Sequence, residues 1–136
     1  MNKIVLGLVL GGVLGIFDGC TALLSGPELF QGPDWVSSLL GIVVGSTFKG
    51  LVAGVITGWF ARKLQNLPLG IGVGLFASAL VTFPIAWMQR DHEVTHRNYF
   101  WAIMIPGAIC GAIVGFATQR YGKAPAPAAV RMGDRR

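Results

Sequence analysis

The stretch Gly45-Ser46-Thr47-Phe48-Lys49-Gly50 places one lysine among small residues in the middle of an apolar run that extends from Trp35 to Ala61. Lys49 is the only charged residue of that run. At roughly 1.5 Å per helical residue the run is about 40 Å long, which is enough to cross a bilayer. An ammonium group at that depth costs about 3 kcal/mol or more unless it faces protein or water and has a partner. The stretch therefore predicts a membrane-spanning helix that carries a buried charge.

Asp18 is the best partner for Lys49, because it is the only carboxylate inside any apolar run of the chain. On a helical wheel Asp18 lies on the same arc as Gly11 and Gly15, so it faces a packing surface and not lipid. Lys49 shares its own arc with Ser46. Side chains lean toward the N-terminus of their helix, so the two groups lean toward each other in antiparallel neighbours. The sequence predicts an ion pair near the middle of the membrane.

The composition describes a small polytopic membrane protein. Of the 136 residues 53% are apolar and only 12% are charged, about half the charged fraction of a soluble domain. Glycine and proline punctuation divides the chain into four apolar segments, which predicts an all-α four-helix bundle in one domain, residues 1–120, with helices at about 4–25, 35–61, 67–87 and 99–118. We expect the first segment to stay in the mature protein as a helix. The basic, Ala/Pro-rich residues 121–136 are expected to form a disordered cytoplasmic tail.

Basic residues are distributed unequally between the two sides of this bundle. Eight of the eleven lysines and arginines fall on the side of the two termini, and only Arg90 and Arg97 fall on the other side. The positive-inside rule then predicts that both termini are cytoplasmic, and we expect a bacterial cytoplasmic membrane. This distribution also explains the net charge of +5, so the lipid bilayer and not nucleic acid is the expected partner.

Small residues recur at every fourth position in all four segments, which gives each helix one smooth stripe where backbones can approach closely. These stripes comprise Gly7, Gly11, Gly15 and Gly19; Gly50, Gly54 and Gly58; Gly70 and Gly74; and Gly107, Gly111 and Gly115. They predict close packing within one protomer or between protomers. Because four short helices should not surround much of a cavity, we expect the stripes to serve a homo-oligomer or a larger membrane complex.

The order of the stripes also suggests a duplicated hairpin. Residues 49–58 align with residues 106–115, so that two parallel hairpin repeats would each start inside, cross and return. The alternative is that any glycine-rich helix aligns with any other. In this alignment Val81 and Pro106 stand where the first half has Asp18 and Lys49, so a charged site would be asymmetric.

Two interpretations of the charged pair stay open. In the first, the pair is an intramembrane polar site on a transport path, because buried ionisable groups in membranes mark such paths. In the second, the pair only pins two helices together. Hydroxyl groups on the inward arcs either line the same pore or bond to carbonyls of their own helices; they belong to Ser46, Thr47, Thr57, Ser78 and Thr82.

Other chemistry is not indicated. His92 and His96 are four residues apart in a polar loop, but neither the zincin pattern nor an apolar helix surrounds them, so no metal is expected. Cys20 and Cys110 lie in apolar segments, where we expect them to act as small buried hydrophobes. Nothing resembles a catalytic triad or a phosphate loop, and we expect no enzyme and no cofactor. No motif of small multidrug transporters and no polar-aromatic pattern of small fluoride channels is found, so no family is assigned.

The sequence leaves two classes of function. One is a small, oligomeric channel or transporter for a small solute or ion, with Asp18 and Lys49 on its path. The other is a non-catalytic accessory or scaffold subunit that packs into a larger membrane complex through its glycine stripes.

Overall fold

The computed structural model describes residues 1–90 and 98–123, and this part of the chain is a bundle of long helices without strands. The first span breaks at Thr21 into two helices, and a short 3-10 helix follows it. The elements in order are α1 Lys3–Cys20, α2 Ala22–Ser25, η1 Pro27–Phe30, α3 Trp35–Lys63, α4 Leu67–Met88 and α5 Phe100–Tyr121.

Four helical stretches are long and apolar enough to cross a membrane, namely Lys3–Ser25, Trp35–Lys63, Leu67–Met88 and Phe100–Tyr121. The predicted all-α bundle of four spans is therefore confirmed, and the chain is a multi-pass integral membrane protein. The largest difference from the predicted bounds is at the end of the last span, which continues beyond residue 118 to Tyr121. The polar residues Gln119 and Arg120 are good helix formers, so the helix extends into the interface. The predicted tail beyond residue 123 lies outside the described residues.

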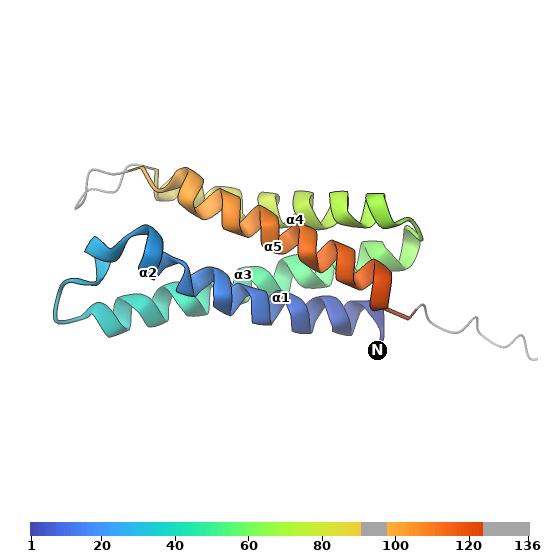
Figure 1. Cartoon of the computed structure of the whole chain (residues 1–136), viewed down its shortest axis with the longest axis horizontal. Helices are drawn as coiled ribbons and strands as arrows, with labels where there is room; N and C mark the ends of the chain where they lie inside the picture. Colours follow the sequence, from blue (N-terminus) through green and yellow to red (C-terminus); the bar gives the residue numbers. More distant parts are fainter. Residues whose placement is uncertain (91–97, 124–136) are drawn as a thin grey trace, which may run out of the picture.

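The helices form two hairpins, α1 with α3 and α4 with α5, which lie on one another along their length (Figure 1). The first and last described residues meet at one end of the bundle, where the Lys123 N–H donates to the Met1 carbonyl at 3.0 Å. We call this the termini end. The opposite end, with η1 and the start of α5, is the loop end. Met1 and Lys123 thus lie on one side of the bundle, while the cytoplasmic location of the termini stays a prediction.

The glycine stripes bring the backbones of each hairpin into contact. A Cβ atom added to Gly11 would overlap the carbonyl oxygen of Gly50, and one added to Gly54 would overlap that of Gly7. In the second hairpin the same is true of Gly74 and the carbonyl oxygen of Gly111. The stripes are therefore occupied within one chain. Association between copies stays a prediction, which these contacts do not require.

The contacts also define how the two hairpins correspond. Gly11 meets Gly50 as Gly74 meets Gly111, and a second pair of contacts repeats the relation. The Thr57 hydroxyl donates to the Ala53 carbonyl at 2.7 Å, and the Thr118 hydroxyl donates to the Val114 carbonyl at 2.8 Å, both deeply buried. Hairpin α4–α5 therefore repeats the packing of α1–α3.

This correspondence corrects one part of the sequence alignment. With Val81 in the place of Asp18, the residue in the place of Lys49 is Cys110 and not Pro106. The sequence alignment was off by one helical turn, because a stripe with glycine at every fourth residue matches almost as well after a shift of four. The charged site remains asymmetric, as expected.

We predict that Gly111→Ala lowers the free energy of unfolding by about 1–3 kcal/mol, because the new methyl group would push α4 and α5 apart. The measurement is the midpoint of unfolding in an SDS titration of the protein in mild detergent. Gly72→Ala is the matched control, since a Cβ there has no neighbour within 4 Å. We expect this control to be neutral or slightly stabilising, because alanine favours helix over glycine. Equal effects of the two variants would contradict the packing described here.

Candidate functional site

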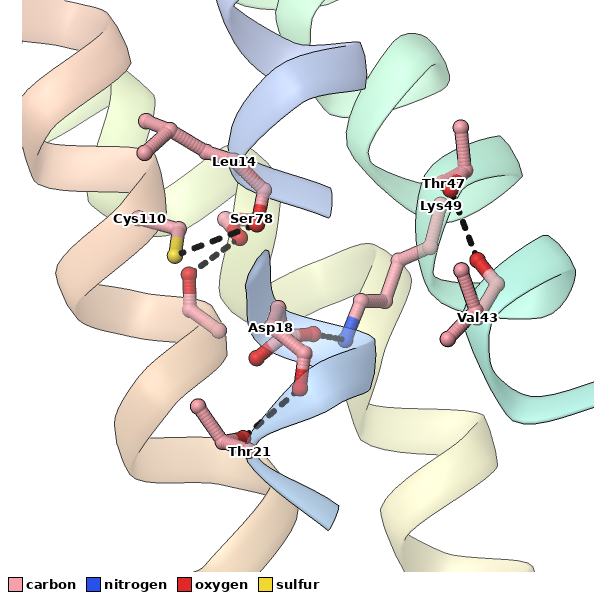
Figure 2. A network of polar contacts seen from close by, with 9 residues as sticks. Leu14, Asp18, Thr21, Val43, Thr47, Lys49, Ser78 and Cys110 are labelled. Carbon is pink, nitrogen blue, oxygen red and sulfur yellow. Dashed lines mark hydrogen bonds and ion pairs between the residues drawn. The ribbon is translucent and has the colours of Figure 1, made fainter. Parts of the chain in front are cut away.

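The pair of Lys49 and Asp18 lies where α1 and α3 face each other (Figure 2). The Lys49 Nζ is 2.5 Å from Asp18 Oδ2, and the side chains are only 6% and 7% exposed. Glycines beside the carboxylate make this approach possible, since a Cβ on Gly15 would press on the backbone of Ser46 and Thr47. This ion pair joins two spans in the middle of the bundle.

A large cavity leads from the loop end down to this pair. Its volume is about 670 Å³, and residues of α1, α2, α3, α4 and α5 line it. Hydroxyl-bearing residues line its wall together with the ion pair: Thr21, Ser25, Ser37, Ser38 and Ser46, with Asp18 and Lys49. This size is within the range of ligand-binding cavities in proteins. We call it the vestibule.

The vestibule overturns the expectation that four short helices cannot surround much of a cavity. The reason is visible in the spacing of the glycines along α3. Gly50 and Gly54 touch the backbone of α1, whereas a Cβ on Gly41 or Gly45 would have no neighbour within 4 Å. The contact between α1 and α3 continues as far as Gly19 and Val43. The face of α3 that carries Gly41 and Gly45 is open, and these two glycines line the vestibule.

A second, much smaller cavity lies on the other side of the pair. Its volume is about 20 Å³, and its wall includes Asp18, Lys49, Thr57, Ser78 and Cys110. A cavity of this volume has room for about one water molecule or an ion of similar size. The ion pair therefore separates a wide vestibule from a space for a single small particle.

The hydroxyl residues expected on a path divide into two groups. Ser46 lies on the vestibule wall, and Thr57 and Ser78 lie on the wall of the small cavity. Thr47 and Thr82 lie on neither wall. The Thr47 hydroxyl donates to the Val43 carbonyl at 2.7 Å, and the Thr82 hydroxyl is buried without a hydrogen-bond partner.

Most of these hydroxyl groups donate to backbone carbonyls. The Thr57 hydroxyl bonds within its own helix, and the Ser78 hydroxyl donates across the second hairpin to the Gly107 carbonyl at 2.5 Å. Each hydroxyl that uses its proton in this way still offers lone pairs to a neighbour. Bonding to backbone carbonyls therefore occurs in these residues, while their place on a transport path stays a prediction.

Sequence reasoning missed several polar groups of the bundle. Lys3 was treated only as a topological charge, yet it is 5% exposed and its Nζ donates to Ala61 and Gln119. At the loop end the Tyr99 hydroxyl donates to Glu28 at 2.7 Å and ties η1 to the start of α5. The sequence offered only a weak signal for these, since polar residues near helix ends are usually solvated.

The cysteines are only partly as expected. Both are free, but Cys20 is exposed on the surface of the bundle, and Cys110 is half-buried at the small cavity, where its thiol approaches the Leu14 carbonyl (Figure 2). Within residues 1–90 and 98–123 no three His, Cys, Asp or Glu side chains come close enough to hold a metal ion. The loop with His92 and His96 lies outside the described residues.

Comparison with known proteins gives a partial likeness. Two curated proteins, both called Fluoride-specific ion channel FluC, come from Escherichia coli O1:K1 / APEC and Escherichia coli O45:K1 (strain S88 / ExPEC). Each is 26% identical to this chain over 84 residues, which cover 61% of this chain and 64% of the relative, less than two thirds of its length. No family model and no solved structure matches the chain. This likeness was not expected from the sequence, because the chain does not carry the polar-aromatic pattern of small fluoride channels.

We predict that water fills the vestibule as far as the ion pair. In a background without native cysteines, Ser38→Cys and Ser46→Cys should react quickly with a water-soluble maleimide in native membranes. Thr57→Cys, which lies beyond the pair, should react at least about tenfold more slowly, because buried thiols are inert. Val44→Cys is the control, since Val44 is exposed on the outer surface of the same helix and would meet only lipid. A Ser46→Cys rate as low as that of the control would contradict a hydrated vestibule.

Proposed function

We propose that this protein is a channel or transporter for a small anion, and that the vestibule, the Asp18–Lys49 pair and the small cavity form one end of its path. The observation that carries the proposal is the position of the pair: it closes a cavity of about 670 Å³ and faces a cavity of about 20 Å³ on its other side. Charged groups buried in membrane proteins typically mark such paths. The bacterial relatives named fluoride-specific ion channels support the same class and a bacterial membrane.

The charge balance favours an anion over a cation. The buried charged side chains in the described bundle are Lys3, Lys49 and Asp18, so the interior carries more positive than negative charge. Fluoride is about as large as a water molecule and would fit the small cavity. Fluoride is therefore the first anion to test, on the strength of the relatives' name and of this volume.

The pair would act by exchanging partners. In the structure Asp18 neutralises Lys49, which keeps the ammonium stable but leaves it no net charge to offer. An anion arriving through the vestibule would compete with the carboxylate for the Lys49 Nζ. The hydroxyls of Ser46 on one side and Ser78 on the other lie on the walls of the spaces that the anion would leave and enter.

The accessory or scaffold role is the competing proposal. It requires no path, and the pair would then only fasten α1 to α3. Copurification of a larger partner in fixed stoichiometry, together with a purified protein that conducts no ion, would favour it over the anion path.

We predict that Asp18→Asn or Lys49→Met lowers the yield of folded protein, because removing one partner of a buried pair costs about 3–5 kcal/mol. The double variant should recover the yield, since two neutral groups need no counter-charge. It should nevertheless lose ion flux in liposomes, measured for fluoride, chloride, protons and small cations.

Flux through the double variant at the wild-type rate, together with recovered yield, would reduce the pair to a helix fastener and remove the proposed path. A double variant that stays poorly folded would show that the two residues do not act as partners. Lys63→Met is the matched control for the loss of a lysine, because Lys63 is exposed and rests on the Trp59 ring.

We also propose that the termini end faces the cytoplasm, as the distribution of basic residues indicates. A single cysteine at Asn66, in the exposed turn between α3 and α4, should be labelled by a membrane-impermeant maleimide only after the membrane is opened. Labelling in intact cells would reverse the orientation.

A further inference from the structure

Lys3 is a second buried ammonium, at the termini end of the bundle. The residue is 5% exposed, and its side chain lies against Gly122 of the chain's own C-terminal part. Its Nζ donates to the Ala61 carbonyl at 2.8 Å and to Gln119 Oε1 at 2.9 Å. Ala61 is in the last turn of α3, where carbonyl groups have no helical partner and attract a cation.

The charge of Lys3 differs from that of Lys49 in one respect. Lys49 is paired with a carboxylate, whereas both acceptors of Lys3 are neutral oxygens of a peptide and an amide. An ammonium has three donors, and a buried one is strongly stabilised by a negative partner. In the described part of the chain, Lys3 is therefore the buried cation with charge left to offer to an anion.

Gln119 holds this ammonium and closes the termini end at the same time. Its Oε1 accepts from Lys3, and its Nε2 donates to the Leu64 carbonyl just beyond α3. Its side chain also fills the space in front of Gly70 on α4. One amide side chain of α5 thus touches elements from all the other spans.

The cluster of Lys3, Ala61 and Gln119 continues the direction of the cavities. Thr57 and Val114 line the small cavity, and Ala61 and Thr118 lie one helical turn further toward the termini end on the same faces of α3 and α5. Ala61 and Thr118 are almost fully buried. A particle leaving the small cavity in this direction would next meet the cluster.

We propose that Lys3 is a second anion-binding group at the termini end of the path, and that the Gln119 amide closes the path by occupying the ammonium in place of an anion. This inference rests on the proposed function and adds the place where the path is closed. A neutral amide oxygen is the weaker acceptor of the two, because a negative charge attracts a buried ammonium more strongly than a neutral dipole does. An anion can therefore displace Gln119 from Lys3.

The test uses the full chain with three changes and one control. Gln119→Ala removes the competing amide, Gln119→Glu supplies a permanent carboxylate at the same place, and Lys3→Gln removes the ammonium. Lys63→Gln is the control, because it removes an exposed lysine from the same end and so keeps the topological charge equal to that of Lys3→Gln.

Two measurements are made on each variant. The first is fluoride flux from liposomes. We expect the flux to rise about tenfold in Gln119→Ala and to fall about tenfold in Gln119→Glu and in Lys3→Gln, the ratio typical of one hydrogen bond to a charged group. The second is the unfolding midpoint with sodium fluoride against sodium gluconate at equal ionic strength. The upward shift caused by fluoride should be largest in Gln119→Ala, smaller in wild type and Lys63→Gln, and lost in Gln119→Glu and Lys3→Gln.

The two measurements separate this inference from the proposed function. One outcome is that wild type conducts fluoride while none of the three changes alters the flux and all variants show an equal midpoint shift. This result would overturn the role of Lys3 and Gln119 and leave the path intact. A second outcome is that wild type conducts no fluoride but shows a fluoride-dependent midpoint shift, and that this shift is lost in Lys3→Gln. This outcome would support the anion site and reject the path. A rise in flux in Gln119→Glu would overturn the closing role of the amide.

Discussion

The structure depends on the cost of an ammonium group inside a membrane. Lys49 cannot be stable in the middle of α3 unless another span brings a negative group to it, and among the other spans only the first, which contains α1, carries one. This requirement selects the neighbour of α3 and its orientation. It also demands a close approach, which the glycines of both helices allow because a Cβ on most of them would overlap the opposite backbone. The packing of the first hairpin and the charge it encloses are therefore two parts of one constraint.

The second hairpin shows what the same scaffold looks like without that constraint. Its glycines meet in the same register, and Thr118 repeats the buried hydrogen bond of Thr57. Val81 and Cys110 occupy the places of the charged residues, and Cys110 turns toward the small cavity beside Lys49. The two hairpins therefore share the same helix packing, whereas only the first carries the charged pair. A repeat that keeps its glycines and changes its polar residues can hold a single charged site without a second, competing one.

Sequence reasoning reached the features that follow from local pattern. Long apolar runs gave the spans, and the isolation of Asp18 and Lys49 singled out the two residues that the structure joins. It failed for features that depend on the register between packed helices, that is, on which turn of one helix contacts which turn of another. The glycine stripe repeats every four residues, so the match of Lys49 with Cys110 could not be told from a match one turn away. The vestibule was missed because it depends on which faces of the helices are left open. The sequence alone does not distinguish Gly45, which faces open space, from Gly50, which contacts a backbone. Lys3 was missed because a lysine at a helix end is usually solvated, and only the assembled bundle shows that Gln119 and Gly122 cover it.

The two ends of the bundle differ in a way that follows from this packing. At the termini end the glycine contacts continue to Gly58, which meets the backbone of Lys3 and Ile4, so the helices have no room to separate. At the loop end the break at Thr21 turns the chain into the short α2, and Gly41 of α3 faces open space. Wide access is thus possible from one side only, and at the other side a single flexible side chain can decide between closed and open. Helices whose backbones pack closely through glycines are not expected to move independently, because a shift of one helix would disturb every contact along the stripe. The polar side chains at the ends of the stripes, Lys49 with Asp18 on one side and Lys3 with Gln119 on the other, are the groups that can move without disturbing it.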